Sequence, residues 1–425
     1  MKTKKSAQRG RSGVDRTVQT LKGFRDFLPE EKRRRDFVMA KIKQVFELFG
    51  FEPLETPTLE YASLLLGKYG EEADKLVYQF KDRGGRKIAL KYDQTVPTAR
   101  VLAQYKNQLP KYFRRYQIQN VFRAEKPQKG RFREFTQCDP DIFGSTSPLA
   151  DAEVISCTFF VFKNIGFKNI VLKINDRQIL FDALKPFVSK KVDIFSIIQS
   201  IDKLEKVGKD GVIKELVKKG LKKQKAQEAL LAINEAKITP SLKTIIDYSI
   251  SLGIPENSIE FSPTLARGLD YYTGMIFEVI VPEYSKDSLG GGGRYDKLIG
   301  QLGGVDVPAV GIAYGFDRIV EAAEKLNLLP SAKTNAKVLV TIFDEKLIDK
   351  SLETVAALRQ GKIATELYPA LDKLPKQLKY ADKKGIPYVV IIGPEEVKEN
   401  KVTLKNMGTG KQQLLSIKEV VEVIQ

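Results

Sequence analysis

The chain has 425 residues, a formal net charge of +18 at pH 7 and no histidine or tryptophan. It is long enough for two or three domains, and its only cysteines, Cys138 and Cys157, cannot build a disulfide framework or a cysteine-based metal site. The lack of histidine excludes imidazole acid–base catalysis and histidine-ligated metals, whereas the positive charge favours an anionic partner such as nucleic acid.

The N-terminal residues 1–16 are basic and contain no apolar segment. They predict a disordered tail rather than a secretory signal. Apolar runs such as FSIIQSI and YVVIIG are too short to span a bilayer. We therefore expect a cytoplasmic protein with no membrane partner.

A first helix is predicted over residues 30–48, where apolar residues recur at helical spacing before Gly50. Pro53 and Pro57 then break the chain into extended pieces. Strands are predicted at KIALKYD, YFRRYQIQNVFR, REFTQCDPDIFG and NIVLKIN, with a helix over residues 151–162. Many neighbouring strands with polar turns predict an antiparallel sheet flanked by helices.

Two of these strands form a predicted hairpin with arginines next to its loop. Arg123 ends the first strand, Arg131 and Arg133 begin the second, and EKPQKG forms the loop between them. Strand alternation places Arg123 on one face of the sheet, where its guanidinium can bind a phosphate with two hydrogen bonds. For this segment alone, the alternative is an edge hairpin with solvated charges.

Residues 185–240 differ from the rest, with 13 lysines against 7 acidic residues and several amphipathic helical runs. They predict a helical insertion over residues 185–257. Strand patterns resume at residue 258, so residues 17–184 and 258–330 form one predicted domain. The lysines of the insertion either form a solvated face or contact a nucleic-acid backbone.

A polar linker, LNLLPSAKTNAK, leads to a second predicted domain over residues 333–425. Its strands VLVTIF, IATELY and YVVIIG alternate with helices, and VTLKN and IKEVVEVIQ follow. This alternation predicts a small α/β domain with a mostly parallel sheet.

Three later motifs, LARGLDYYTG (265–274), SLGGGGRYDKLIG (288–300) and AVGIAYGFDRIV (309–320), resemble those of histidyl-tRNA synthetases in order and spacing. The resemblance runs from LKGFRDFLPEE (21–31) through FGFEPLETPTLE (49–60), similar to class II motif 1, and LKYDQTVPTAR (90–100) to KQLKYADKKGIPYVVIIG (376–393). It implies an α+β class II catalytic domain on an antiparallel sheet, a helical insertion and an α/β anticodon-binding domain. The implied activity is a histidine–tRNA ligase, a homodimer that joins L-histidine to histidine tRNA with ATP.

The resemblance also implies roles for individual residues in ATP binding. Arg123 and Arg267 match the catalytic arginines that approach the α-phosphate and the substrate carboxylate. Arg318 matches the motif 3 arginine on the γ-phosphate, and Glu125 and Arg131 match positions of the ATP-binding hairpin. Mg²⁺ is expected to bridge the phosphates while retaining water ligands, without a dedicated protein metal site.

The implied histidine site includes contacts to the α-amino group and to the ring. Its members are Asp93, Gln94, Thr95, Arg123, Gln137, Asp141, Arg267, Tyr271 and Tyr272. Gln128 and Lys129 are expected to contact the acceptor end of the tRNA. Many bacterial members have Glu-Gly-Thr and Glu at positions 93–95 and 141, so the residues here favour the archaeal and eukaryotic branch.

Three other functions are weighed against this one. The glycine-rich SLGGGGRYDKL could be a phosphate-binding loop, but it lacks the GK[ST] ending. The regulatory subunit of ATP phosphoribosyltransferase resembles the same catalytic domain, but it typically lacks the C-terminal domain and loses the ATP-site arginines that this chain retains. A synthetase-like RNA-binding protein without aminoacylation can be separated only by activity.

Overall fold

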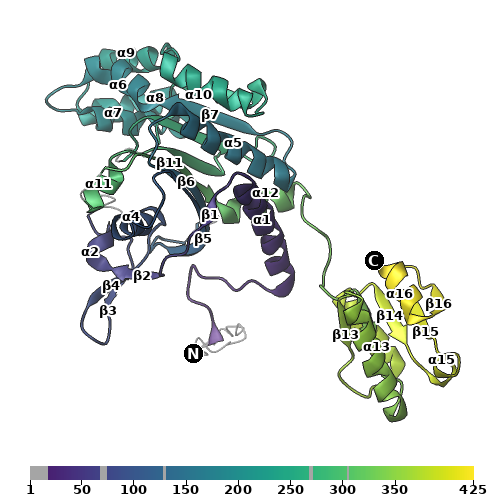
Figure 1. Ribbon diagram of the computed structural model, residues 1–425. Coiled ribbons are helices and arrows are strands. Elements are labelled where there is room, and N and C mark those ends of the chain that lie inside the picture. The colour runs from purple at the N-terminus through teal and green to yellow at the C-terminus, as the bar shows by residue number, and fades with distance from the viewer. Residues whose placement is uncertain (1–17, 68–73, 128–130, 268–270, 304–305) are drawn as a thin grey trace, which may run out of the picture. The chain divides into compact units, whose positions relative to one another are not determined.

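The computed structural model describes residues 18–67, 74–127, 131–267, 271–303 and 306–425, so the predicted tail lies outside the described residues. The chain divides into two compact units (Figure 1). The larger unit contains most residues up to Leu329, and the smaller contains Pro330–Gln425 together with Phe27–Arg34. Within the described ranges, no helix is both long and apolar enough to cross a membrane.

An eight-stranded sheet forms the larger unit, in the order β1-β5-β6-β11-β10-β9-β7-β8. The strands are β1 (Glu52–Pro53), β5 (Phe113–Phe122), β6 (Glu134–Phe143), β7 (Val171–Asp176), β8 (Ile259–Phe261), β9 (Met275–Ile280), β10 (Gly290–Arg294) and β11 (Ala309–Gly315). All neighbours from β5 to β7 are antiparallel, whereas β1 and β8 run parallel to β5 and β7 at the edges. The predicted antiparallel sheet is confirmed at its centre.

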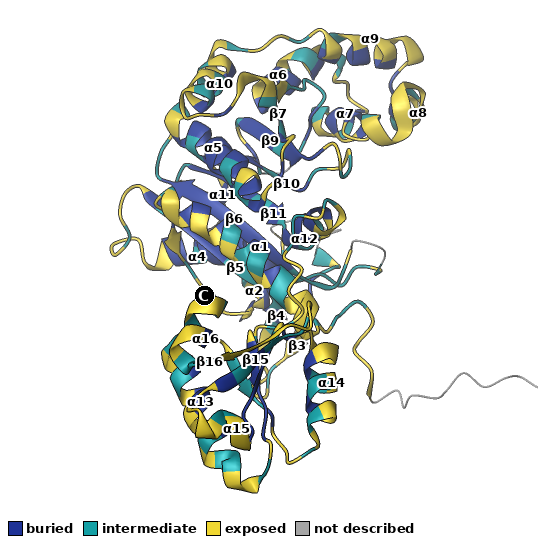
Figure 2. Cartoon of the chain, turned by 90° about the vertical axis from the view of Figure 1, so that its right-hand side faces the viewer, coloured by how far each residue is buried: buried dark blue, intermediate teal, exposed yellow. Residues whose placement is uncertain are grey.

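Helices α1 (Pro29–Leu48), α5 (Pro148–Ile165) and α12 (Phe316–Lys325) cover one face of this sheet (Figure 2). Their buried apolar side chains share a core with Cys138 and Ile142 of β6. Helix α5 begins at Ser147, whose side chain accepts a hydrogen bond from the backbone of Leu149, and ends at Gly166 in the left-handed region. Apolar side chains fill this face, whereas the buried acidic side chains of β6 lie on the other face of the sheet.

A helical segment lies between β7 and β8 in the chain. It comprises α6 (Arg177–Leu184), α7 (Ile194–Ile201), α8 (Leu204–Lys219), α9 (Lys223–Asn234) and α10 (Pro240–Ser251). The helices from α6 to α9 share a core with Phe143 and Tyr295 on the second face of the sheet. In contrast, Leu242 and Ile245 of α10 belong to the core beneath α1 and α5.

Shorter elements complete the larger unit. Strands β2 (Leu59–Tyr61), β4 (Lys87–Leu90) and β3 (Gln79–Lys81) form a three-stranded sheet in that order. Helix α2 (Ala62–Leu65) packs on this sheet, and α4 (Thr95–Gln104) packs with α11 (Leu298–Gly303). Helix α4 begins at Thr95, the last residue of the YDQT segment to which the sequence assigns substrate binding.

The smaller unit is a five-stranded sheet in the order β13-β12-β14-β15-β16. The strands and main helices are β12 (Val338–Val340), α13 (Ile348–Gln360), β13 (Thr365–Leu367), α14 (Leu374–Lys384), β14 (Tyr388–Ile391), α15 (Pro394–Lys398), β15 (Val402–Asn406), β16 (Gln412–Leu415) and α16 (Ile417–Ile424). The first three strands of the sheet are parallel, but β15 and β16 are antiparallel. The predicted mostly parallel sheet is therefore mixed, because Gly410, with a φ of 74°, helps to turn the chain back into a hairpin.

Candidate active site

Small residues occupy part of the second face of the large sheet, on β10 and β11. The register places Gly291 of β10 opposite Ala313 of β11, and Gly293 opposite Gly311. Since these residues project little or nothing from the sheet, they leave room above it, and a cavity of about 430 Å³ lies there, lined in part by Gly291 and Ala313. The glycine-rich segment is therefore a β-strand that forms the floor of the cavity. A phosphate-binding loop would instead lie directly before a helix.

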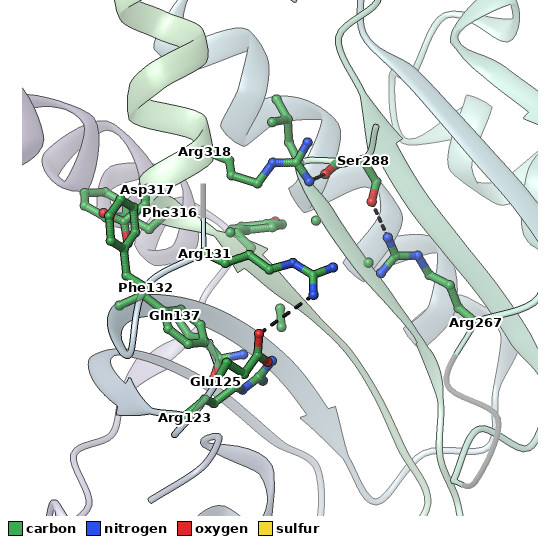
Figure 3. A pocket seen from close by; sticks show the side chains of 17 residues that line it. Arg123, Glu125, Arg131, Phe132, Gln137, Arg267, Ser288, Phe316, Asp317 and Arg318 are labelled. Atoms are coloured by element: carbon green, nitrogen blue, oxygen red, sulfur yellow. Dashed lines mark hydrogen bonds and ion pairs between the residues drawn. The ribbon is translucent and has the colours of Figure 1, made fainter. Parts of the chain in front are cut away.

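Four arginines line this cavity, and they come from distant parts of the chain. They are Arg123, Arg131, Arg267 and Arg318. Figure 3 shows Arg131 reaching across the cavity between Arg318 and Glu125, with Arg267 on the far side beside Ser288. Such a cluster of guanidinium groups is suited to bind a polyanion with several phosphate groups.

Arg267 and Arg318 are held by one shared residue. The Arg267 Nε lies 2.6 Å from the Glu278 carboxylate on β9, and its Nη2 donates to the Ser288 hydroxyl. The Ser288 carbonyl in turn accepts from Arg318 Nη1 at 2.6 Å. A β-carbon at Gly291 would lie 2.0 Å from Arg267 Nη1, so this position of the arginine requires glycine there.

Arg123 and Arg131 are held more loosely. The Arg123 Nε donates to the Tyr92 carbonyl at 3.3 Å, and its guanidinium lies 4.4 Å from the centre of the Tyr92 ring and 5.0 Å from that of Phe135. Arg131 lies 3.8 Å from the Glu125 carboxylate, and its side chain is 61% exposed. Contacts with aromatic faces fix the plane of a guanidinium while leaving its edge able to bind an anion.

Beyond the cavity, Asp141 is buried on β6 between two partners. Arg115 on the neighbouring β5 lies 2.7 Å from its Oδ2, and the Tyr295 hydroxyl donates to its Oδ1. The Arg115 contact lacks hydrogen-bond geometry, so Oδ2 has no hydrogen-bond partner among the described residues. Burial raises the pKa of Asp141, and Arg115 and Tyr295 oppose that rise.

Three tyrosines gather around this carboxylate. The ring centroids of Tyr271 and Tyr272 are 4.4 Å apart. The Tyr295 centroid lies 6.1 Å from that of Tyr271 and 6.5 Å from that of Tyr272. The Tyr271 hydroxyl donates to the Tyr272 hydroxyl at 3.3 Å. Burial raises the pKa of Tyr272 to about 12, so its phenol stays protonated near neutral pH. A carboxylate and a neutral phenol can together orient a ring that has two different nitrogens.

The YDQT segment lies beside the same strand. The Asp93 carboxylate accepts hydrogen bonds from the backbone N–H groups of Thr95 and Val96 at 3.1 Å and 3.3 Å, at the start of α4. Gln94 is fully buried, and its amide donates to the Gln137 carbonyl at 2.9 Å. Gln94 therefore holds the start of α4 against β6, next to Gln137, which lines the cavity.

Comparison with known proteins assigns this architecture. Residues 23–319 match the family model described as histidyl-tRNA synthetase, and residues 337–425 match the one described as anticodon binding domain. The chain belongs to the histidyl-tRNA synthetase family.

Curated relatives of this synthetase family match almost end to end. The chain is 41% identical to a histidine–tRNA ligase of Christiangramia forsetii, over 92% of this chain and 95% of that protein. It is 39% identical to one of Cytophaga hutchinsonii, over 94% and 98%. A crystal structure of histidyl-tRNA synthetase from Nostoc sp. PCC 7120 superposes with a TM-score of 0.84 at 31% identity, covering 97% of this chain and 99% of that one.

These relatives are bacterial, so the expected placement nearer the archaeal and eukaryotic branch of the synthetase family is not supported. That expectation depended on the shorter acids at positions 93 and 141. In the structure Asp141 lies 2.7 Å from Arg115, and Asp93 accepts hydrogen bonds from the backbone at the start of α4. These local contacts accommodate the shorter acids.

The structure brings most of the predicted synthetase residues to one face of the sheet, whereas Gln128 and Lys129 lie outside the described residues. Sequence reasoning missed four supporting residues: Arg115, Glu278, Ser288 and Tyr295. Arg115 had a usable signal, because strand alternation must send it and Arg114 to opposite faces. Arg114 contacts Glu153 of α5 at 2.9 Å, which leaves Arg115 for the site.

A buried lysine next to the site predicts an unusual pH dependence of stability. Lys91 is fully buried, and its Nζ donates to the Thr56 carbonyl at 3.3 Å. Burial lowers the pKa of Lys91 to about 8, whereas an unfolded chain has a lysine pKa of about 10.4. Between these two values the unfolded state binds more protons, so this group makes the folded state more stable as the pH rises.

Urea unfolding at about pH 7.5 and about pH 10 measures this contribution. Replacing Lys91 with methionine should remove most of the stability gain between the two pH values. Lys81→Met, on the exposed strand β3, is the matched control and should keep the gain. An equal pH response of the wild type and Lys91→Met would contradict the argument.

Proposed function

We propose that the protein is a histidine–tRNA ligase. It activates L-histidine with ATP to histidyl-adenylate and transfers the histidyl group to the 3′ end of histidine tRNA. The observation that carries this proposal is the four-arginine cavity on the same sheet face as the cluster of Asp141 and its tyrosines. ATP–pyrophosphate exchange with each amino acid tests it, and exchange supported equally by another amino acid would refute it.

In the first step, the histidine carboxylate attacks the α-phosphorus of ATP, and pyrophosphate leaves. The nucleophile is already ionised, so no side-chain base is required, which is consistent with a chain that has no histidine of its own. We assign Asp93, Thr95 and Gln137 to the α-amino group of the substrate. Asp141 and Tyr272 then bind the ring, with Tyr271 lining the pocket.

The main barrier in this reaction is the approach of two anions, and positioned cations lower it. We assign Arg123 and Arg267 to the α-phosphate and the substrate carboxylate, from opposite sides of the cavity. Arg318 binds the γ-phosphate. Phe132 lines the cavity with Arg25 stacked 3.3 Å from its ring centre, and it offers an aromatic surface for the adenine.

Mg²⁺ is the inferred cofactor, with ATP as substrate. Glu125 fits a hydrated ion, because its carboxylate faces the cavity and, among the described residues, its ion pair is a long contact of 3.8 Å with Arg131. When bound, the ion would neutralise charge on the phosphates. By contrast, Asp317 at the same cavity already accepts from Arg25 and Arg35 at 2.6 Å, so it is less available as a ligand.

We infer the domain roles from this activity. Residues 17–184 and 258–330 form the catalytic domain, 185–257 the helical insertion and 333–425 the anticodon-binding domain, after a basic tail at 1–16. The hairpin loop with Gln128 and Lys129 contacts the acceptor end of the tRNA. The free buried thiols of Cys138 and Cys157 and the tRNA substrate support a cytoplasmic location.

Truncation can test whether the two domains have separate roles in activation and in tRNA recognition. Deleting the residues after Ser331 should leave ATP–pyrophosphate exchange nearly intact, because every residue assigned to activation precedes that position. Aminoacylation of histidine tRNA should fall strongly, since the anticodon contact is lost. Parallel measurement of both reactions decides the matter, and equal loss of both would point to a folding defect.

A homodimer is the inferred assembly, formed through the segment around Gly50–Pro57 that resembles motif 1. Large apolar side chains near this segment stay exposed in the single chain, notably Leu48 at 80%, Tyr61 at 59% and Leu59 at 43%. Burying them against a second copy would remove apolar surface from water. Sedimentation at micromolar concentration should give the mass of a dimer, and a monomer mass would reject this assembly.

A further inference from the structure

The site face of β6 carries a third polar residue between the two already assigned. Gln137, Asp139 and Asp141 alternate along the strand and project to the same side, whereas Cys138 between them points into the apolar core. Gly315 lies opposite Gln137 and Gly311 opposite Asp141, so Ala313, which lines the cavity, is the small residue beside Asp139. Asp139 thus lies between Gln137, which lines the cavity, and Asp141, which contacts the tyrosine cluster.

The Asp139 carboxyl is buried without the partners that such a group needs. It is 3% exposed, and its Oδ1 has no hydrogen-bond partner among the described residues. The nearby cations are bound elsewhere: Arg115 donates to the backbone carbonyl of Asp139 at 2.6 Å and lies beside Asp141, and Lys91 donates to the carbonyl of Thr56. A buried carboxyl in this condition is costly unless a ligand supplies the missing donor.

Two neighbouring acceptors are also incompletely satisfied. Gln137 Oε1 has no hydrogen-bond partner in the part of the chain that the structure describes, and Asp141 Oδ2 has none beyond its ion pair with Arg115 at 2.7 Å. Three acceptors in a row along one strand, each about 6.6 Å from the next, match a ligand with more than one N–H group. Histidine is such a ligand, because it has an α-ammonium group at one end and ring N–H groups at the other.

We propose that Asp139 is an additional substrate-binding residue, which accepts a hydrogen bond from the α-ammonium group of the bound histidine. The proposal rests on the ligase function above and adds a second carboxylate, beside Asp93, to the contacts of the α-amino group. Asp141 is matched to the ring through Tyr272 and Tyr295, and Gln137 borders the ATP cavity. The position between them therefore belongs to the α-carbon and its amino group.

The electrostatics around Asp139 agree with this assignment. Burial raises the pKa of Asp139 well above its usual range, and the nearby Asp141 and Asp93 add to the rise, while Arg115 and Arg123 oppose it. An ammonium group arriving within hydrogen-bond distance would stabilise the ionised form. Asp139→Asn keeps the shape and the acceptor oxygen but removes the charge, so this variant is suited to the test.

The test uses two compounds that differ only in the amino group: histidinol and its deamino analogue, 4-(3-hydroxypropyl)imidazole. Calorimetry on the full-length wild type should show tighter binding of histidinol. In Asp139→Asn, the ratio of the two dissociation constants should fall by about ten- to a hundredfold, while the affinity for the deamino compound changes little. Asp141→Asn is the matched control and should weaken both compounds alike.

Equal weakening of both compounds in Asp139→Asn would overturn the proposal, because it would show that Asp139 only supports the pocket. So would a wild type that binds the two compounds equally. If Asp139→Asn does not fold, as judged by circular dichroism and ATP binding, Asp139→Ser replaces it with the same expected fall in ratio. A wild type without histidine-dependent pyrophosphate exchange would refute the ligase function itself, so the two failures are distinguishable.

Discussion

Replacing Arg267 with alanine should slow histidyl-adenylate formation by about a hundred- to a thousandfold, with a much smaller effect on histidine binding. The physical reason is that the negative charge between the carboxylate and the α-phosphate is concentrated as the new bond forms. Arg267 is already oriented for that moment by Glu278 at 2.6 Å and by Ser288. Single-turnover adenylate formation, measured beside histidine affinity, separates the two effects.

Two further variants sharpen this result. Glu278→Gln keeps the size of the orienting side chain but removes its charge, so it should cause an intermediate loss. Arg131→Ala removes a side chain that is 61% exposed and has one long ion pair, so its effect should be the smallest of the three. Near-normal turnover of Arg267→Ala would remove this residue from its assigned role.

Replacing Gly291 with alanine should cost nearly as much activity without removing any functional group. The added methyl carbon would lie 2.0 Å from Nη1 and 2.4 Å from Cζ of Arg267, so the guanidinium must leave its place. The nearest atoms belong to the end of a flexible side chain, and we expect the free energy of unfolding to change by less than about 1 kcal/mol. Adenylate formation should still fall by about a hundredfold.

A variant with both substitutions, Gly291→Ala and Arg267→Ala, tests why the glycine substitution lowers activity. Because Gly291→Ala acts by displacing Arg267, adding it to Arg267→Ala should cause almost no further loss. Gly84→Ala is the control substitution, since the nearest atom to its new carbon is 3.4 Å away. Multiplicative losses in the double variant, or a collapse of stability in Gly291→Ala alone, would show that the glycine matters for another reason.

The sequence predicts the architecture of the larger unit well where local patterns and tertiary structure agree. The hairpin of Arg123 forms as predicted, because its two long strands are bounded by a polar loop with Pro127. Extended segments are predicted near β1 and β8, but their parallel pairing is not, because strands of two and three residues carry no signal of the direction in which they pair. In the smaller unit, β16 escapes prediction because QQLL has no β-branched residue, and only the hairpin with β15 makes it a strand.

The residues of the candidate site also fall into those that the sequence could predict and those that it could not. The arginines of the cavity stand in motifs, so their positions in the chain could be inferred from a resemblance. Tyr295 and Ser288 act through contacts with residues 154 and 21 positions away, Asp141 and Arg267. Such contacts depend on the register between strands and on loops that meet above the sheet, and no local pattern reveals them. Asp139 was missed for the same reason, since its significance depends on what Arg115 and Lys91 contact.

The cluster of Tyr271, Tyr272 and Tyr295 gives this protein a built-in optical signal. Its ring centroids lie between 4.4 Å and 6.5 Å apart, in the cluster to which we assign the substrate ring. With no tryptophan in the chain, tyrosine emission cannot be lost by energy transfer to an indole, and three of the 16 tyrosines belong to this cluster. Occupation of the site should therefore change the intrinsic fluorescence, which allows ligand binding to be followed without a dye or a coupled assay.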